Sequence, residues 1–209
     1  MKSFRALVCA LAILAAIGSA SFAAYAHSPS IQPRSVAAAT SIAKLQQRLL
    51  KIVNKERRSL GAGPLTLNSK LSSCALRHSI AMQRSGKQFH DITHDVCIAH
   101  NYDGENVGHQ NGKPLAALKK INKQMWNEGP CPVKLVKGLV CTPFGNAADF
   151  ALWEAHSHYL NLTCKLFSVI GIGIYIKNGW TWLTEDFVGY YHKGDPRSTF
   201  CTNRKNGGV

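Results

Sequence analysis

Two histidines and two glutamates are the side chains of this sequence that could act together. His90 follows an amphipathic segment, Glu105 lies in a Gly-Glu-Asn triplet, Glu128 comes shortly after a tryptophan, and His158 lies between a serine and a tyrosine. Neutral imidazoles bind divalent ions such as zinc, and a carboxylate can ligate the ion or orient a water molecule on it. Without a metal, the same four groups are general acids and bases. Either chemistry requires a fold that brings them to one cleft.

Nucleophilic catalysis has little support in this chain. The sequence lacks a G-x-S-x-G motif, and its cysteines are expected to be oxidised, which leaves no thiolate to attack a substrate. Ser157 directly precedes His158, but adjacent side chains seldom face each other. The four imidazole and carboxylate groups therefore stay the candidates for chemistry.

Three amphipathic helices are predicted to position these groups. Apolar residues at steps of three and four predict a helix that begins at Ser41 and ends before Gly61. Asn68 is a favourable N-cap and Gly86 a favourable C-terminal stop, so a second helix is predicted between them. A third helix follows Pro114, because proline is preferred at the first helical position.

Near the C-terminus the hydrophobic period changes to two. Isoleucines alternate with glycines in residues 169–177, Asn178-Gly179 is a strong turn signal, and residues 180–188 return as the partner strand. The glycines on one face permit a neighbouring element to approach closely. Helices followed by a hairpin indicate an α+β protein whose helices pack on an antiparallel sheet.

The remaining histidines have simpler interpretations. His78 falls on the apolar stripe of the second helix and is interpreted as a hydrogen-bonded core residue. His156 is expected to face solvent. His94, His100 and His109 flank the Gly-Glu-Asn triplet, where one of them could supplement a metal site.

Residues 1–26 have the organisation of a secretory signal peptide. Two basic residues precede an unbroken apolar run over residues 6–17, and an Ala-Tyr-Ala stretch that ends at Ala26 provides the cleavage site. The run is short for a membrane span, although an uncleaved anchor is the alternative. Cleavage removes both basic residues and lowers the formal net charge from +14 to +12. Residues 27–40 lack periodicity and are expected to form a flexible lead.

Cleavage would leave six cysteines, an even number that predicts three disulfides in an exported protein. No C-x-x-C spacing is present, which disfavours a zinc ribbon or a thioredoxin-type redox site. The sequence suggests only one of the pairs, Cys131 with Cys141, which would close a local loop. The six residues are Cys74, Cys97, Cys131, Cys141, Cys164 and Cys201.

In their order along the chain, these features resemble the CAP superfamily, which contains cysteine-rich secretory proteins, insect venom antigen 5 proteins, plant pathogenesis-related proteins and many bacterial exported members. The resemblance covers about residues 41–191. Its most specific parts are Gly104-Glu105-Asn106 and the strand Ile170–Ile174. Phe89-His90 and Ser157-His158-Tyr159 fit the same pattern.

The resemblance implies an α-β-α sandwich with a large open cleft on one side. In the family this cleft typically carries two histidines and two glutamates. The family commonly places its second glutamate three residues after the tryptophan, whereas Glu128 lies two residues after Trp126, so Glu154 stays a rival. The corresponding cleft residues in this chain are His90, Glu105, Glu128 and His158.

The resemblance also divides the chain. A CAP domain is expected over residues 41–191, and residues 192–209 are expected to be a C-terminal tail tethered by Cys201. Asn106 and Ser157 are expected to line the cleft with the four charged residues. Residues 129–149 depart from the family pattern and are expected to roof one end of the cleft.

Two classes of function are open at this point. The favoured one is a secreted, non-enzymatic binding module in which His90 and His158 hold zinc or another divalent ion and the cleft captures a small hydrophobic ligand or an extracellular protein. The alternative is a metal-assisted hydrolase, a peptidase or esterase, with Glu105 or Glu128 as general base to a metal-bound water. Binding is favoured because such a group of residues does not by itself establish a reaction.

The positive charge restricts the partners. Basic residues are scattered and lack the aromatic interleaving of a nucleic-acid reader, so no nucleic acid is expected. For an exported protein, the abundant polyanions are wall polymers and anionic lipid head groups, to which a basic protein is attracted. We expect a monomer that associates with such surfaces in a salt-sensitive way.

Overall fold

The computed structural model describes residues 36–90, 97–98, 102–131, 141 and 146–190. The predicted signal peptide, most of the predicted lead, and the C-terminal tail with Cys201 lie outside these ranges. The helices and strands are α1 (Val36–Ser59), β1 (Thr66–Leu67), α2 (Ser69–Ser85), β2 (Tyr102–Asn111), α3 (Pro114–Asn127), α4 (Ala147–Glu154), α5 (Ser157–Thr163), β3 (Val169–Lys177) and β4 (Trp180–Gly189).

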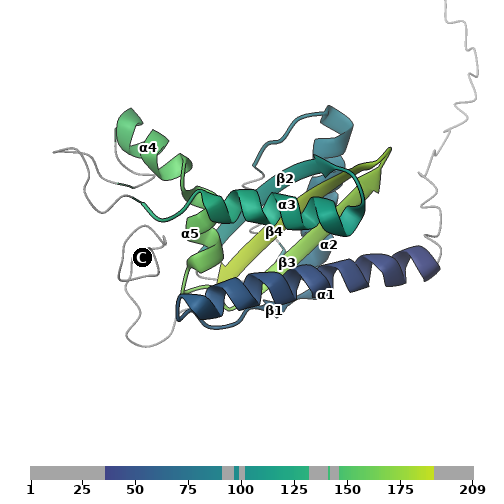
Figure 1. Cartoon of the computed structure of the whole chain (residues 1–209), viewed down its shortest axis with the longest axis horizontal. Helices are drawn as coiled ribbons and strands as arrows, with labels where there is room; N and C mark the ends of the chain where they lie inside the picture. Colours follow the sequence, from purple (N-terminus) through teal and green to yellow (C-terminus); the bar gives the residue numbers. More distant parts are fainter. Residues whose placement is uncertain (1–35, 91–96, 99–101, 132–140, 142–145, 191–209) are drawn as a thin grey trace, which may run out of the picture. The chain divides into compact units, whose positions relative to one another are not determined.

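A four-stranded sheet in the order β1-β3-β4-β2 forms the middle layer (Figure 1). β3 and β4 make the predicted hairpin, and its turn residues Asn178 and Gly179 have φ of 51° and 77°. β2 pairs antiparallel with β4 and is an edge strand, whereas β1 pairs parallel with β3 over two residues. The sheet is therefore mixed, and only its three long strands have the predicted antiparallel arrangement.

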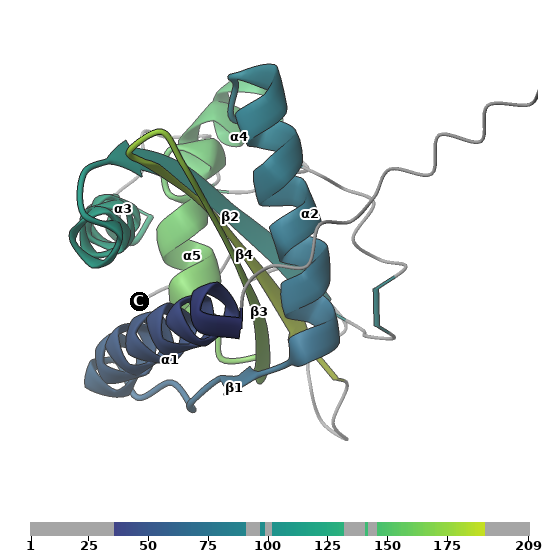
Figure 2. The same ribbon diagram turned by 90° about the vertical axis from the view of Figure 1, so that its right-hand side faces the viewer.

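The two faces of the sheet are covered by different helices. Figure 2 shows α2 on one face and α1, α3 and α5 on the other, which is an α-β-α sandwich. Against α2 the strand β3 presents Gly171 and Gly173. A Cβ atom on Gly173 would lie 2.1 Å from the carbonyl carbon of Ala75, so the absence of a side chain there allows the helix and the sheet to touch.

The larger hydrophobic core lies on the other face. Ile170, Ile172 and Ile174 of β3 pack there with Leu49 and Val53 of α1, and all five side chains are buried. The period-two pattern of the strand and the period of the helix thus place their apolar residues against each other. This packing fixes the sheet whose open edge carries the candidate site.

The helix boundaries follow the local signals with one exception. The Asn68 side chain caps α2, Gly86 ends it in the left-handed conformation, and α3 begins at Pro114, as predicted. α1 begins at Val36 rather than at Ser41, so the last part of the predicted lead is helical. The short helices α4 and α5 and the strand β2 were not predicted.

The buried Arg57 fastens the end of α1 to the chain around α5. Its guanidinium donates hydrogen bonds to the carbonyl oxygens of Gly63, Leu162, Cys164 and Phe167 at 2.8–3.0 Å. Burial lowers the pKa of this guanidinium to about 10, so it keeps its charge at neutral pH. One side chain therefore satisfies four main-chain acceptors where α1, α5 and the start of β3 meet.

Two disulfides join described cysteines. Cys131–Cys141 is the predicted local clip, and Cys74–Cys97 ties α2 to a residue beyond His90. Cys164 is also disulfide-bonded. Over the described ranges, no helix combines the length and the apolar character needed to cross a bilayer.

Candidate functional site

The candidate site lies at the open edge of the sheet, along β2. Glu105 and Asn106 are neighbours on this strand, so their side chains point to opposite faces. Glu105 points to the α2 face, where it meets His78, and Asn106 points to the other face, where its amide donates to the carbonyl oxygen of His158 at 3.2 Å. Groups from both faces thus reach the same edge of the sheet.

Glu105 holds two histidines at once. The Nδ1 atom of His78 lies 2.6 Å from Oε2, and the Nδ1 atom of His90 lies 2.9 Å from Oε1. The side chains of Glu105 and His78 are only 5% and 4% exposed, whereas that of His90 is 52% exposed. With Glu105 ionised, each imidazole donates its Nδ1 proton, which leaves Nε2 as the acceptor nitrogen.

Glu128 forms the second pair. Its Oε1 atom lies 2.5 Å from Nδ1 of His158, and its Oε2 atom accepts the backbone N–H groups of His158 and Tyr159 at 3.0 and 3.4 Å. These N–H groups belong to the first turn of α5, whose N-cap residue makes no side-chain cap of its own. Glu128 therefore both orients His158 and caps α5, while the rival Glu154 is exposed at the end of α4.

The two pairs meet at the sheet edge. His90, from the segment after α2, and His158, from α5, have ring centroids 6.0 Å apart with planes inclined at 34°. The structure thus brings together the four predicted side chains, although they come from four different elements or segments. We call His90, Glu105, Glu128 and His158 the tetrad.

The other predicted cleft residues have supporting positions. Asn106 is fully buried, and Asn161 of α5 donates to its Oδ1 atom and to the backbone oxygen of Glu105. Ser157 is also buried, and its hydroxyl donates to the carbonyl oxygen of Glu154 rather than to His158. Asn106 and Asn161 thus connect β2 to α5 behind the tetrad.

The remaining histidines occupy defined positions. The interpretation of His78 as a buried, hydrogen-bonded residue is confirmed, but its bond to Glu105 was not foreseen. His156 is partly buried and not fully solvated as expected, because its Nδ1 atom donates to the carbonyl oxygens of Glu128 and Gly129 at 2.8 and 3.0 Å. His109 stacks on an indole ring, and His94 and His100 lie outside the described residues.

A cavity of about 250 Å³ adjoins the tetrad and is lined by residues of β2 and α3. Its apolar wall contains Val107, Ile121 and Met125, and its polar wall includes Glu128 and His158. A cavity lined by both apolar and charged side chains is suited to an amphiphilic molecule. We call this space the tetrad cavity.

The tetrad consists of imidazoles and carboxylates, which are donor types that bind divalent ions. The Nε2 atom of His158 is buried and has no hydrogen-bond partner among the described residues, and the carboxylate bond at Nδ1 fixes the tautomer in which Nε2 can ligate. Within the described ranges, no three His, Cys, Asp or Glu side chains are arranged to hold one ion. His90 and His158 alone would leave coordination positions open.

A buried acidic residue lies behind the tetrad. Glu185 of β4 is paired in register with Asn106 and is completely buried. Burial raises the pKa of the Glu185 carboxyl to about 8, the adjacent Asn106 amide opposes the rise, and the charges of Glu56 and Asp186 add to it. Burial also raises the pKa of Glu56, against the hydrogen bond from Asn122. Glu185 is therefore protonated at neutral pH.

Comparison with solved structures gives three similar proteins, of which only the first has a TM-score above 0.5. The structure of BmVAL-1 has a TM-score of 0.53 and 14% sequence identity, and the match covers 77% of this chain and 82% of that chain. The structure of NaASP2 with Zn²⁺ has a TM-score of 0.47 and 14% identity, with 74% and 88% covered. An extracellular protein with an SCP domain from Bacillus anthracis str. Ames has a TM-score of 0.46 and 18% identity, with 68% and 39% covered, so this chain spans about two fifths of that protein.

Comparison at the level of sequence identifies the family. None of the curated proteins compared with this chain matches it. Residues 50–191, in contrast, match the family described as CAP, the cysteine-rich secretory protein family. This range includes β1 to β4 and every residue of the tetrad. The chain therefore belongs to the CAP family of cysteine-rich secretory proteins.

Proposed function

We propose that this protein is a secreted binding module whose tetrad holds a divalent ion, zinc foremost, and whose adjoining cavity takes a small hydrophobic ligand. The observation that carries this proposal is that each of the two histidines at the sheet edge is hydrogen-bonded to a carboxylate of its own. His90 is bonded to Glu105 and His158 to Glu128 through Nδ1, so that both rings are held with Nε2 available. An ion bound there would supply a positive charge with open coordination positions.

The same hydrogen bonds favour binding over hydrolysis. A metal-assisted hydrolase needs a carboxylate that is free to take a proton from a metal-bound water. Both oxygens of Glu105 are engaged by imidazoles, and both oxygens of Glu128 are engaged by α5 and His158. Each of these oxygens already accepts a hydrogen bond, so taking a proton from a bound water would weaken the contact with a histidine or with the start of α5.

The tetrad cavity supports a ligand with an apolar body and an anionic end. Val107, Ile121 and Met125 would contact the body, and the charged end would lie beside His158. A bound divalent ion would strengthen the attraction to a carboxylate head group. Medium-chain fatty acids have this chemistry and a size that suits a space of about 250 Å³.

Export belongs to the same proposal. The disulfides Cys74–Cys97 and Cys131–Cys141 are typical of an oxidising compartment, and the N-terminal sequence has the form of a signal peptide. N-terminal sequencing of the protein recovered from the medium of expressing cells tests this part. A mature chain that begins at His27 would agree with it, and retention of Met1 in the membrane fraction would contradict it.

Zinc binding is tested by calorimetric titration of the chelator-treated protein with Zn²⁺. The wild-type protein should bind one equivalent, and His90→Ala and His158→Ala should each weaken binding at least about tenfold. Glu154→Gln is the control, because Glu154 is an exposed carboxylate at the end of α4, outside the tetrad. Equal zinc affinity in all four proteins would refute the metal site.

The choice between binding and hydrolysis has its own test. Decanoate should bind the zinc-loaded protein, and Met125→Lys should abolish this binding because it places a charge in the lining of the cavity; thermal unfolding checks that the variant is folded, since Met125 also belongs to the core. In parallel, the zinc-loaded protein is incubated with ester and peptide libraries. Turnover that is lost in Glu128→Gln while zinc stays bound would replace the binding proposal with hydrolysis.

A further inference from the structure

A second cavity lies at the tip of the β3–β4 hairpin, away from the tetrad. It has a volume of about 330 Å³. Its wall combines the end of α2, the edge strand β2 and the hairpin itself. The lining residues are Gln83, Gly86, His109, Lys177, Asn178, Trp180 and Trp182. We call it the tryptophan pocket.

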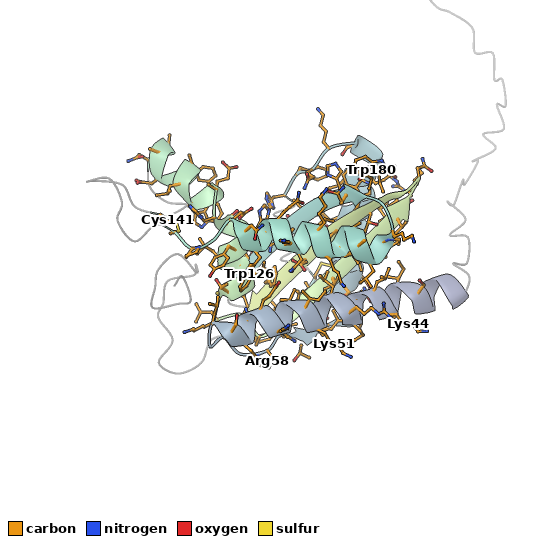
Figure 3. The ribbon with its side chains drawn as sticks, in the orientation of Figure 1. Lys44, Lys51, Arg58, Trp126, Cys141 and Trp180 are labelled. Atoms are coloured by element: carbon orange, nitrogen blue, oxygen red, sulfur yellow. A yellow bond between two sulfur atoms is a disulfide. The ribbon has the colours of Figure 1, made fainter. Side chains whose placement is uncertain are left out.

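Three aromatic rings form one wall of this pocket. His109 of β2 stacks on Trp182, its cross-strand partner, with centroids 4.4 Å apart and planes inclined at 11°. The centroid of Trp180 lies 5.2 Å from that of His109. Trp182 is buried, but Trp180 is 40% exposed, although it is among the largest apolar side chains of the protein. Figure 3 labels Trp180 near the hairpin end of the sheet and Trp126 near the opposite end of the domain, on α3.

The spacing of the rings decides what kind of ligand they can receive. A planar molecule that inserts between two rings needs them about 7 Å apart, twice the contact distance of carbon atoms. The separations of 4.4 and 5.2 Å leave no such slot between His109 and either indole. The wall therefore offers an outer aromatic face on Trp180. The C–H groups on one side of a pyranose ring pack on such a face, because they are weakly positive and the indole face is negative.

The polar lining has the groups that recognise a sugar. The side-chain amides of Gln83 and Asn178 each provide donors and an acceptor, which matches the alternating needs of vicinal hydroxyl groups. Lys177 is exposed on the hairpin and adds a positive charge. The described residues that line the pocket include no carboxylate, and the chain as a whole carries a net charge of +14. Charge complementarity thus selects an acidic sugar.

We infer that the tryptophan pocket binds a uronate-containing saccharide, with one pyranose ring on Trp180 and its carboxylate at Lys177. The hairpin turn holds both residues in place, because Asn178 and Gly179 are in the left-handed conformation that a tight two-residue turn requires. This site depends on neither the tetrad nor a metal.

The position of the pocket also determines along which strand a longer saccharide would extend. His109 lines both the tryptophan pocket and the tetrad cavity. Saccharide units beyond the one on Trp180 would therefore run along β2 from the hairpin toward His158. A tetrasaccharide should bind more tightly than a disaccharide of the same composition.

The inference is tested by calorimetric titration of the full exported chain with three tetrasaccharides. A hyaluronan fragment and tetragalacturonate supply uronate from animal matrix and plant wall, and chitotetraose is the neutral comparison. Trp180→Ala removes the aromatic face, and Trp153→Ala, on α4, is the matched tryptophan control. Lys177→Gln removes the charge and keeps a polar side chain. Thermal unfolding of each variant shows whether it is folded.

The expected result is that at least one uronate tetrasaccharide binds more tightly than chitotetraose, and the tighter uronate identifies the source. Trp180→Ala should weaken binding at least about tenfold, as for other ligands stacked on an aromatic ring, and Trp153→Ala should leave it unchanged. Lys177→Gln should remove the preference for uronate over chitotetraose. The inference is overturned if no tetrasaccharide binds, if chitotetraose binds as tightly as both uronates, or if Trp180→Ala has no effect.

Discussion

The geometry of the site depends on Glu105, because its two carboxylate oxygens bind two histidines, one buried and one half exposed. His78 is buried in α2 and His90 is half exposed at the sheet edge. Packing between Phe89 and His78, with ring centroids 4.9 Å apart, fixes the buried side of this arrangement. His78 is therefore a positioning residue: it holds the carboxylate that holds His90.

Replacement of His78 tests this role. His78→Asn should leave Oε2 of Glu105 without its 2.6 Å partner and lower the free energy of unfolding by about 1–3 kcal/mol. Zinc affinity should also fall, about 10- to 100-fold, as for other residues that orient a metal ligand. Chemical denaturation and calorimetry measure the two effects. A loss of stability with unchanged zinc affinity would mean that His78 is only a core residue.

The buried Glu185 predicts how stability depends on pH. Its pKa is about 8 in the folded protein against an ordinary value of 4.5, so between these pH values the folded state holds a proton that the unfolded chain has lost. The free energy of unfolding should therefore decrease as the pH rises from about 4.5 to 8. Glu185→Gln cannot ionise and should be more stable than the wild type at pH 8, with the difference disappearing near pH 4.5. Chemical denaturation at several pH values measures this difference, and Glu154→Gln, at an exposed position, is the control. If the free energy of unfolding of the wild type, Glu185→Gln and Glu154→Gln changed with pH in parallel, the prediction would be wrong.

At the level of elements, the contact between α2 and β3 depends on the absence of side chains. A Cβ atom on Gly171 or Gly173 would lie within 2.1–2.5 Å of backbone carbons in α2. Backbone atoms cannot rotate away as a flexible side chain can. Two glycines of β3 therefore determine how closely α2, the helix that carries His78 and precedes His90, can pack on the sheet.

Gly173→Ala should consequently push α2 from the sheet and destabilise the protein by about 3 kcal/mol, at the upper end of the usual cost of overpacking. Gly63→Ala is the matched control, because a Cβ there meets nothing within 4 Å and the residue does not have a positive φ. Thermal and chemical denaturation measure both variants. Equal stability of the two would show that α2 adjusts its position freely.

The sequence predicted those elements whose pattern is local. α2 and α3 have capping residues and a helical period, and the β3–β4 hairpin has alternating isoleucines and an Asn-Gly turn. β2 was missed because its residues include Gly104, Asn106 and Gly108, which are poor strand formers. α5, with seven residues, is too short to show a helical period.

The candidate site could be predicted only in part. The proximity of His90 and His158 was expected from a resemblance to a family, and no spacing in the chain implies it. The structure shows why Glu128 can pair with His158 despite the short gap after Trp126: it is the C-cap residue of α3, and its side chain caps α5. The hydrogen bond between His78 and Glu105 depends on where α2 lies over β2, and the sequence does not reveal this position.

At the scale of the whole molecule, a stripe of exposed basic residues follows α1. Lys44, Arg48, Lys51, Lys55 and Arg58 follow each other at steps of four and three, so they form one stripe of the helix, and all five are exposed. Figure 3 shows Lys44, Lys51 and Arg58 on the side of α1 that is turned away from the sheet. Such a stripe presents a linear positive surface to a polyanion.

This stripe should bind anionic membranes in a salt-sensitive way. The protein should sediment with vesicles that contain phosphatidylglycerol, and binding should fall as NaCl is raised from low to about 0.5 M, since screening shortens the range of the attraction. Replacement of Lys44, Lys51 and Lys55 by glutamine should weaken binding more than the same change at Lys119, Lys120 and Lys123 of α3. Equal losses would mean that net charge alone determines the association.

The Cys74–Cys97 bond encloses both histidines that meet Glu105, since His78 and His90 lie between its two cysteines. The covalent ring limits how far the segment after α2 can move from the sheet edge. A chain synthesised in a reducing cytoplasm would lack this restraint, and His90 would be free to leave its carboxylate. Under the export proposed above, formation of the Cys74–Cys97 bond would be the step that completes the restraint on His90.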